Sequence, residues 1–325
     1  MPGCPLAEWL YEAGIGEARA ALVDGGTILK ARIALEGTLA VGTVAEARLV
    51  EALGGGQGRV TLLDGSGDAL LAAVPRGLSV GRTLLVTIVR EVIPEPGRAK
   101  LAKAVVAAEG AGPAIGPGLR ERIAETGLPV RDCRAHEGDM LEAAGWSEVL
   151  EEAVTGEIAF PGGVLRMSPT PAMTLFDVDG TGALDALAVA AATAVGQAIV
   201  RHAIGGSIGV DFPSVQGKGP RQAVAAAIDA ALPQDLAGPF ERTALNGFGF
   251  LQIVRSRPRA SLPELLRSDP TGAAARAALR QIERSPPGAS RRHSLPTAVK
   301  ARIDARPDWL AELNRRTGGA IVLED

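Results

Sequence analysis

The stretch that decides the fold reads GGVLRMSPTPAMTLFDVDGTG at residues 162–182, and GGSIGVDF follows it at residues 205–212. The first stretch holds two apolar segments of strand length, VLRMS and AMTLFDVD, and the second holds one, SIGVD. Between the stretches, residues 185–204 form an Ala-rich run typical of a buried helix, and we place its end at Gly205 and Gly206. A second helix and a further strand, FGFLQIVRSR, come next. This alternation predicts a two-layer domain of a sheet covered by helices.

Shorter strands precede this domain. Residues 17–35 read as two strands joined by Asp24-Gly25-Gly26, a hairpin turn signal. Residues 38–106 continue as short apolar segments separated by glycine and proline. Five or so strands in about 70 residues are typical of a small OB-like barrel, although a generic β-meander fits the same pattern. Residues 107–160 contain two helical segments around a short strand.

Composition sets broad limits. The chain has 325 residues, of which 46% are apolar and 3% aromatic. That length suits one large domain or two to three small ones, with cores built from Ala, Val, Leu and Ile. A formal charge of −3 argues against a histone-like polycation. It leaves room for a local basic surface, because residues 255–316 hold 14 basic and 6 acidic side chains. A solvated basic face is the alternative interpretation of that stretch.

The cysteines and apolar runs bear on location. The two cysteines, Cys4 and Cys133, form no CxxC pair, so we expect neither an all-cysteine zinc site nor a disulfide framework. The N-terminal residues include acids and lack a long apolar run, which is unlike a signal peptide. The apolar run at 186–200 is shorter than the roughly 20 residues of a membrane span. We therefore expect a cytoplasmic protein with no membrane partner.

The segment FDVDGTG at residues 176–182 places Asp177 and Asp179 at the end of an apolar strand, on one face of it. A phosphatase of the haloacid-dehalogenase type has a similar DxDGT motif, but its downstream acidic magnesium motif has no counterpart after residue 181. A calcium loop beginning at Asp177 would need a glutamate at its twelfth position, where Ala188 stands.

A third interpretation pairs this segment with Asp211, which ends the next strand along the chain. Two neighbouring strands that each end in a carboxylate can supply two oxygen ligands to one Mg²⁺ ion. Such an ion can activate a water for attack on a phosphate. The alternative is that both aspartates are ordinary turn residues at strand ends.

Three blocks together resemble the motifs of the ribonuclease E/G family in the same order: residues 162–182, residues 205–212 and NGFGFLQIVRSR at 246–257. The N-terminal EARAALVDGGTILKARI resembles the opening strands of that family. The resemblance is good over roughly 160–258 and fair over 17–105. It implies magnesium-dependent cleavage of single-stranded RNA, in RNA processing or decay, that leaves a 5′-phosphate and a 3′-hydroxyl.

The resemblance also implies an α+β architecture with an OB-like barrel inserted near the N-terminus and a deoxyribonuclease-I-like α/β catalytic domain. The expected parts are N-terminal strands packing on the catalytic part (1–36), the OB-like RNA-binding domain (37–106), a shortened connecting or sensor-like region (107–160), the catalytic domain (161–258) and a small basic C-terminal domain (259–325).

Metal and catalytic residues follow from the same resemblance. Asp177 and Asp211 fall on the two metal-binding aspartates of the family pattern, and the implied ion is Mg²⁺, for which Mn²⁺ can substitute. Asp179 stands where the family has asparagine, and it would supply a third ligand or alter the orientation of the attacking water. Thr174 matches a threonine of the same block, and ordinary strand packing would also explain it.

RNA contacts must come largely from cations, because residues 37–110 contain no Phe, Tyr, Trp or His and base stacking on aromatics is therefore impossible there. The family's 5′-monophosphate sensor contains an arginine followed by a threonine. In this sequence Arg131 stands at the arginine position, but Asp132 stands at the threonine position. The candidates for RNA contacts are Arg98, Lys100 and Lys103 in the barrel, Arg131, and Arg255, Arg257, Arg259, Arg291 and Arg292 in the basic stretch.

Two departures from the family limit the prediction. Its zinc-linking CPxCxG motif is absent from the sequence, so we expect no zinc and no zinc-linked dimer; the oligomeric state stays open. The region before residue 160 is short, so we expect a ribonuclease-H-like subdomain to be reduced or missing. The main alternative function is a non-catalytic RNA-binding remnant of the family, and a haloacid-dehalogenase-type phosphatase is the third.

Overall fold

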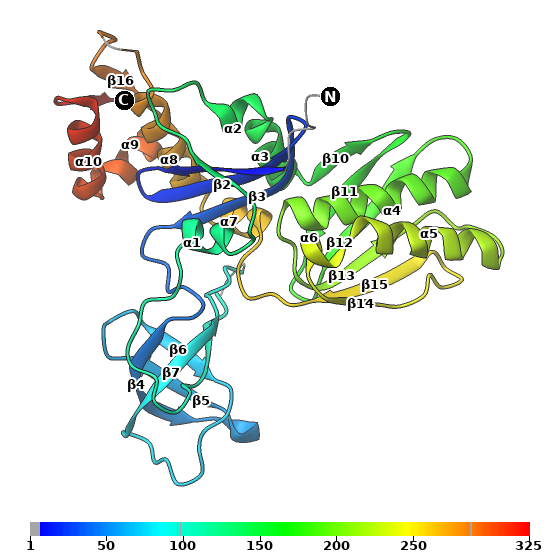
Figure 1. Ribbon diagram of the computed structural model, residues 1–325, viewed down its shortest axis with the longest axis horizontal. Helices are drawn as coiled ribbons and strands as arrows, with labels where there is room; N and C mark the ends of the chain where they lie inside the picture. Colours follow the sequence, from blue (N-terminus) through cyan, green and yellow to red (C-terminus); the bar gives the residue numbers. More distant parts are fainter. Residues whose placement is uncertain (1–6, 96, 98, 287) are drawn as a thin grey trace. The chain divides into compact units, whose positions relative to one another are not determined.

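The structure is a computed structural model that describes residues 7–95, 97, 99–286 and 288–325. The chain divides into two compact units. Unit 1 combines Met1–Glu36, Leu119–Leu150 and Leu265–Asp325, and unit 2 combines Gly37–Gly118 and Glu151–Glu264. The structure groups residues 1–36 with the middle and the end of the chain, and our expectation that they pack on the catalytic part stays a prediction. Figure 1 shows the fold and labels many of its helices and strands.

Unit 1 is built on a four-stranded sheet of order β3-β2-β1-β9, in which β1 pairs antiparallel with β2 and parallel with β9. The predicted hairpin is confirmed, and Gly25 and Gly26 form its turn with φ of 54° and 80°. The strands are β1 (Glu8–Ala13), β2 (Glu17–Asp24), β3 (Thr27–Leu35) and β9 (Val130–Asp132). Strand β9, which lies in the predicted connecting region 107–160, thus belongs to the sheet of the N-terminal strands.

Helices complete unit 1. The C-terminal helices bury Leu279, Trp309 and Leu313 in one cluster with Ile15, which lies in the turn between β1 and β2. The elements are α1 (Leu119–Ala124), α2 (Met140–Ala143), α3 (Trp146–Thr155), α7 (Leu262–Ser268), α8 (Pro270–Glu283), α9 (Thr297–Asp304), α10 (Pro307–Thr317) and the short pair β16 (Arg292–Ser294) and β17 (Val322–Glu324). Of these, α3 and α7 each contain a boundary between the units.

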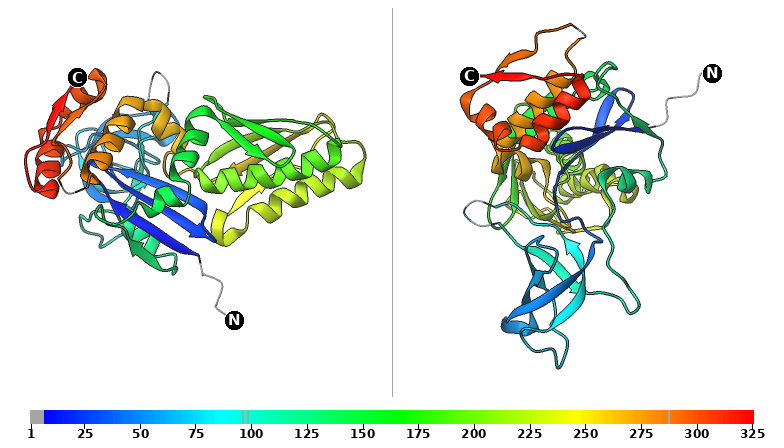
Figure 2. Two further views of the ribbon diagram at one scale, coloured as in Figure 1. Left: turned by 90° about the horizontal axis from the view of Figure 1, so that it is seen from above. Right: turned by 90° about the vertical axis from the view of Figure 1, so that its left-hand side faces the viewer.

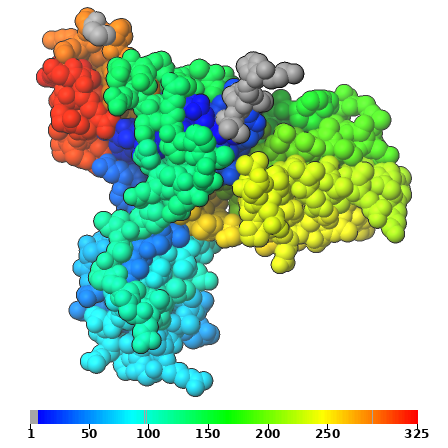
Figure 3. All heavy atoms as spheres, in the orientation of Figure 1, coloured from blue at the N-terminus to red at the C-terminus, as the bar shows by residue number. Residues whose placement is uncertain are grey.

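The first part of unit 2 is a closed five-stranded barrel of order β4-β5-β6-β8-β7. Only β6 and β8 pair in parallel among the described strands of the barrel. Its core consists of Ala, Leu, Val and Ile, as the composition predicted. The elements are β4 (Val44–Ala52), a 3₁₀ turn η1 (Gly54–Gly56), β5 (Gly58–Leu62), β6 (Asp68–Leu71), β7 (Thr83–Arg90) and β8 (Ala102–Val106), coloured blue to cyan in the space-filling view of Figure 3.

The second part of unit 2 is a six-stranded sheet of order β10-β11-β12-β13-β15-β14. Its two central strands, β12 and β13, are parallel, and their other partners are antiparallel. The elements are β10 (Glu157–Phe160), β11 (Gly163–Pro169), β12 (Thr174–Gly180), α4 (Leu184–Arg201), β13 (Gly206–Asp211), α5 (Lys218–Ala231), α6 (Gln234–Ala237), β14 (Phe240–Arg242) and β15 (Phe250–Arg255).

The two faces of this sheet have opposite character. Helices α4 and α5 run side by side along one face (Figure 2). Phe176, Ile208 and Leu251 point to that side, where they are fully buried with Val195 and Ile228 of the helices. Because side chains alternate along a strand, the residues between them lie on the opposite side, which we name the open face.

Helix α4 ends earlier than we predicted. It stops at Arg201 with His202 as its cap, and Ala203 adopts a left-handed φ of 57°. The left-handed residue that ends the helix is therefore Ala203, whereas Gly205 precedes β13 and Gly206 is its first residue. By length and composition α4 could cross a membrane, but 56% of it is buried. That burial, against the sheet and α5, is typical of a core helix.

Candidate functional site on the open face

Asp177 and Asp211 are directly opposite each other on the parallel strands β12 and β13. Both side chains are exposed on the open face. Paired residues on neighbouring strands have their Cα atoms roughly 5 Å apart, so the two carboxylates are near neighbours. No ion pair or side-chain hydrogen bond engages either of them within the described residues. The structure thus brings together the two aspartates that the sequence singled out; we name them the acidic pair.

The acidic pair lies in a row that crosses five strands. The register aligns Glu157, Arg166, Asp177, Asp211 and Phe250 from β10 to β15. Like charges placed directly opposite each other destabilise a sheet. The centre of the row therefore has a charge arrangement that does not serve folding, and such conflicts are expected at functional sites.

Asp179 is used differently from the acidic pair. Its Oδ2 lies 2.9 Å from Nη1 of Arg166, and both side chains are more than half exposed. An exposed pair of this kind contributes roughly 0–1 kcal/mol, so it could open when a ligand binds. Thr174 shares the covered side of β12 with Phe176, which supports the simple packing role for it.

The elements that follow Asp211 bring cations to this edge of the sheet. Helix α5 begins at Lys218 and has no acid in its first turn and no side-chain cap. Arg221 of that turn donates from Nε to the carbonyl of Val215, and its Nη2 would lie 3.9 Å from a Cβ placed on Gly247. Arg221 therefore lies beside the loop that leads into β15, the partner strand of β13.

The acidic pair offers two carboxylates to a cation. Across the described ranges, no group of three or more His, Cys, Asp or Glu side chains is arranged to hold a metal ion. Mg²⁺, however, is commonly held by one or two carboxylates together with waters and substrate phosphates. Two adjacent exposed carboxylates fit that requirement, since Arg166, the register partner of Asp177 on β11, pairs with Asp179 and not with either of them.

The predicted RNA-binding residues of the barrel and the basic stretch are mostly engaged within the protein. Lys100 pairs with Glu95 at 2.6 Å, and Arg98 lies outside the described residues. Arg255 donates to the carbonyls of Ile204 and Ala237. Burial lowers the pKa of Arg255 from its ordinary value, as expected for a guanidinium removed from water.

Other cations of the basic stretch follow the same pattern. Arg257 pairs with Glu264, and Arg259 donates to Glu91 at 3.0 Å. Near the end of the chain, Arg292 pairs with Glu324 at 2.5 Å and Arg291 donates to the carbonyl of Thr317 at 3.3 Å. Arg255, Arg257 and Arg259 are thus engaged within the fold, whereas Arg291 and Arg292 are exposed, and a role of these arginines in RNA binding stays a prediction.

The sensor-like segment lies in unit 1, on β9. Arg131 is exposed there, and Asp132 makes two hydrogen bonds of 2.8 Å with Arg120. The Arg120 hydrogen bonds lower the pKa of Asp132 below its ordinary value. Asp132 therefore stays ionised beside Arg131, which is unfavourable for a phosphate at this point. Burial raises the pKa of the neighbouring Cys133 thiol, so Cys133 is not an activated nucleophile.

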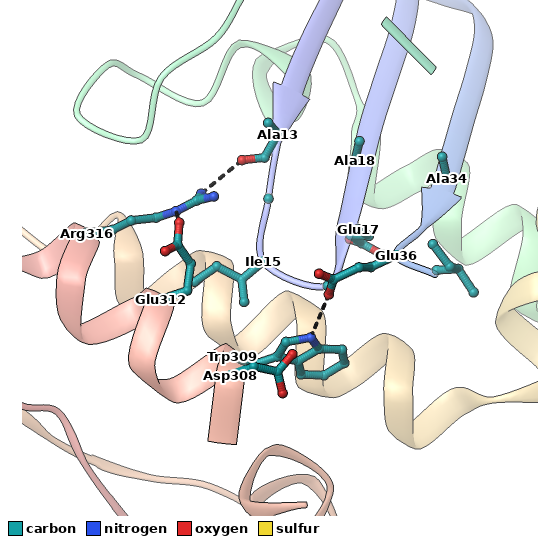
Figure 4. A pocket seen from close by; sticks show the side chains of 13 residues that line it. Ala13, Ile15, Glu17, Ala18, Ala34, Glu36, Asp308, Trp309, Glu312 and Arg316 are labelled. Atoms are coloured by element: carbon teal, nitrogen blue, oxygen red, sulfur yellow. Dashed lines mark hydrogen bonds and ion pairs between the residues drawn. The ribbon is translucent and has the colours of Figure 1, made fainter. Parts of the chain in front are cut away.

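A cavity of about 450 Å³ lies in unit 1, and Figure 4 shows it. Its acids already have partners. Trp309 Nε1 donates to Glu36 at 3.0 Å, Arg306 pairs with both Glu36 and Asp308, and Glu17 holds two arginines of α8. The hydrogen bonds from Arg315 and Arg316 lower the pKa of Glu312, another lining residue, to about 2. The acidic side chains that line the cavity are therefore already engaged in hydrogen bonds and ion pairs.

Comparison with known proteins adds nothing to this geometry: no protein-family model matches the chain, and no curated protein matches it. Two residues near the acidic pair escaped the sequence analysis. Arg166 could have been found from the alternation of VLRMS, which places it on the same face as Asp177. Phe248 stands in the quoted block NGFGFLQIVRSR, and only the structure shows that its side chain is exposed.

Proposed function

We propose that this chain is a metal-dependent endoribonuclease that cleaves single-stranded RNA and leaves a 5′-phosphate and a 3′-hydroxyl. The observation that carries the proposal is the direct opposition of Asp177 and Asp211 on parallel strands, exposed and engaged in no ion pair among the described residues. The resemblance of three sequence blocks to the ribonuclease E/G family supports it.

The acidic pair would hold Mg²⁺, and Mn²⁺ can substitute for it. Oxygen ligands lie about 2.1 Å from Mg²⁺, so carboxylates on strands roughly 5 Å apart can share one ion. When bound, the ion supplies charge neutralisation at a phosphate and activation of a water. In the reaction a water oxygen bonds to phosphorus, the bond from phosphorus to the 3′-oxygen breaks, and that oxygen takes a proton.

The remaining groups would position the substrate. Lys218 and Arg221 at the start of α5 are the cations available to an RNA phosphate near Asp211. Arg166 would exchange its exposed pair with Asp179 for a phosphate oxygen, which leaves Asp179 free to orient the attacking water. Each of these groups acts by binding or orienting.

The wider architecture is also part of the proposal. The strand order of the barrel, with one parallel pair between β6 and β8, supports an OB-type RNA-binding domain. The helix-covered sheet with acids on its other face supports a deoxyribonuclease-I-like catalytic domain. Because the barrel has no aromatic side chain, its contribution to RNA binding would be electrostatic and weak.

The test is to incubate the purified protein with end-labelled single-stranded RNA, in Mg²⁺ or in EDTA, and to map the product ends. The proposal predicts internal cleavage only with Mg²⁺, with 5′-phosphate and 3′-hydroxyl products. RNA binding without cleavage in Mg²⁺ would instead identify a non-catalytic remnant. Hydrolysis of a small phosphomonoester that survives Asp211→Asn would identify a phosphatase, in which Asp177 is the nucleophile and Asp179 the acid.

A further inference from the structure

Phe248 is the one exposed aromatic side chain among the described residues. Its exposed fraction is 88%, whereas the other aromatic side chains are buried or half-buried. An exposed phenylalanine forgoes roughly 1.5–3 kcal/mol of burial. The composition makes the position notable, because only 3% of the chain is aromatic. The ring of Phe248 is therefore available to a partner outside the fold.

The loop that carries Phe248 is fixed by hydrogen bonds. Oδ1 of Asn246 accepts from the backbone N–H groups of Phe248 at 2.9 Å and of Phe250 at 3.0 Å. Gly249 has a φ of +86°, and a Cβ there would lie 2.4 Å from the carbonyl oxygen of Phe212. These contacts hold the loop against Phe212, the residue that follows Asp211, and they fix the backbone that carries Phe248.

The surroundings of Phe248 combine an apolar floor, a cation and the acidic pair. Phe250 is the register partner of Asp211. A Cβ on Gly209 would lie within 3.0 Å of Phe250, Leu175 and Met173, so the missing side chain leaves room for these three apolar groups to meet on the open face. Arg221 lies beside the same loop, at Gly247.

We propose that Phe248 is a stacking platform for one base of a single-stranded RNA bound across the open face. The proposal rests on the proposed function and deepens it. The barrel cannot stack bases, since residues 37–110 have no aromatic side chain, and every base presents a π-face that an exposed ring can meet. Stacking contributes about 1–3 kcal/mol per base and tolerates different sequences. Phe248 would fix the RNA chain while the neighbouring acids act on a phosphate.

The test compares Phe248→Ala and Phe248→Leu with the parent chain for binding of a labelled single-stranded RNA in EDTA, where no cleavage occurs. Phe248→Ala should lower the affinity about fivefold or more, which is the stacking free energy at 1.36 kcal/mol per factor of ten. Phe248→Leu keeps an apolar side chain but has no ring, so it should lose nearly as much. An abasic oligomer of the same length should bind all three proteins equally.

A second readout uses fluorescence. The three native tryptophans, Trp9, Trp146 and Trp309, are buried in unit 1. In Phe248→Trp an exposed indole is added, and RNA with bases should quench it while the abasic oligomer should not. Thermal unfolding checks that the variants fold, and an exposed side chain should change stability by less than about 0.5 kcal/mol.

The outcomes separate the two proposals. If the parent binds RNA but does not cleave it, and Phe248→Ala weakens binding, the platform stands and the catalytic function fails. If the parent cleaves RNA in Mg²⁺ and Phe248→Ala binds and cleaves like the parent, the platform is wrong and the function stands. A change of oligomeric state in Phe248→Ala with unchanged RNA affinity would also overturn the platform, because it would assign Phe248 to a contact between copies.

Discussion

The buried acids of unit 1 and the acidic pair of unit 2 have opposite surroundings. In unit 1, Glu12 is 4% exposed and accepts from Arg19 and Arg284, each at 2.7 Å. Arg19 also reaches Asp139 at 2.6 Å and stacks over the ring of Trp146. In unit 2, Asp177 and Asp211 are exposed, adjacent and without such partners within the described residues.

The difference separates two uses of charge. A buried carboxylate needs a partner, since an unpaired buried charge costs several kcal/mol. Two exposed like charges that face each other on neighbouring strands do not stabilise the fold, and they lower its stability slightly. Unit 1 therefore uses its acids to hold distant segments together, and the acidic pair of unit 2 is free to bind a cation.

The largest effect on stability should come from the buried network. Glu12→Gln leaves the buried guanidinium of Arg19 and that of Arg284 with one charge partner fewer, so the free energy of unfolding should fall by about 3–5 kcal/mol. The matched variant in unit 2 is Asp177→Asn, which removes like-charge repulsion and should change stability by less than about 0.5 kcal/mol. Urea denaturation measures both. Equal losses in the two variants would contradict the comparison.

A pH dependence should follow from Asp139. Burial alone would raise its pKa, but hydrogen bonds from the backbone of Glu142 and from Arg19 outweigh burial, and the pKa lies below the ordinary value. A depressed pKa contributes stability that is present above the unfolded value of about 3.9 and is lost as the pH falls through the folded value. Asp139→Asn should thus lower the midpoint of thermal unfolding at pH 7.

The same variant gives the control for this effect. The difference in unfolding midpoint between Asp139→Asn and the parent should shrink steadily as the pH falls from about 5 toward 3, because the parent then protonates the same carboxylate. A difference that stays constant over this range would show that Asp139 stabilises unit 1 by something other than its charge.

The smallest effect should concern the 5′ end of RNA. Asp132 is ionised beside Arg131 and tied to Arg120, so a 5′-monophosphate gains little at this segment. RNAs with 5′-monophosphate and 5′-hydroxyl ends should be cleaved at similar rates, measured side by side at one salt concentration. A preference of about tenfold, equal to 1.36 kcal/mol, would restore a sensor role to Arg131.

Local sequence patterns were enough to predict that Asp177 and Asp211 lie near the ends of two neighbouring strands of unit 2. Two apolar segments that each end in aspartate, separated by one long helix, form a parallel pair because a helix returns the chain to the same edge of the sheet. The sequence alone therefore places Asp177 and Asp211 together. The hairpin at Gly25 and Gly26 was equally accessible, since its turn demands positive φ values.

Long-range ion pairs could not be predicted in this way. Arg276 and Arg280 hold Glu17, and Arg284 holds Glu12, across more than 250 residues of sequence. Seen in the sequence, these arginines form part of a basic stretch that looks like a surface for RNA. A count of charges contains no information on which acid each arginine meets, so the partners of Arg276, Arg280 and Arg284 became clear only from the fold.

The most direct measurement is a double-mutant cycle on RNA cleavage in Mg²⁺ with Asp177→Asn, Asp211→Asn and the double variant. Each single variant should lose about 100-fold or more in cleavage rate. The double variant should cleave RNA no more slowly than the less active single variant, because all three remove the same step. Glu241→Gln, another exposed acid of the same sheet, should cleave like the parent. If Asp211→Asn cleaves RNA at the parent rate, the two aspartates do not form a joint site.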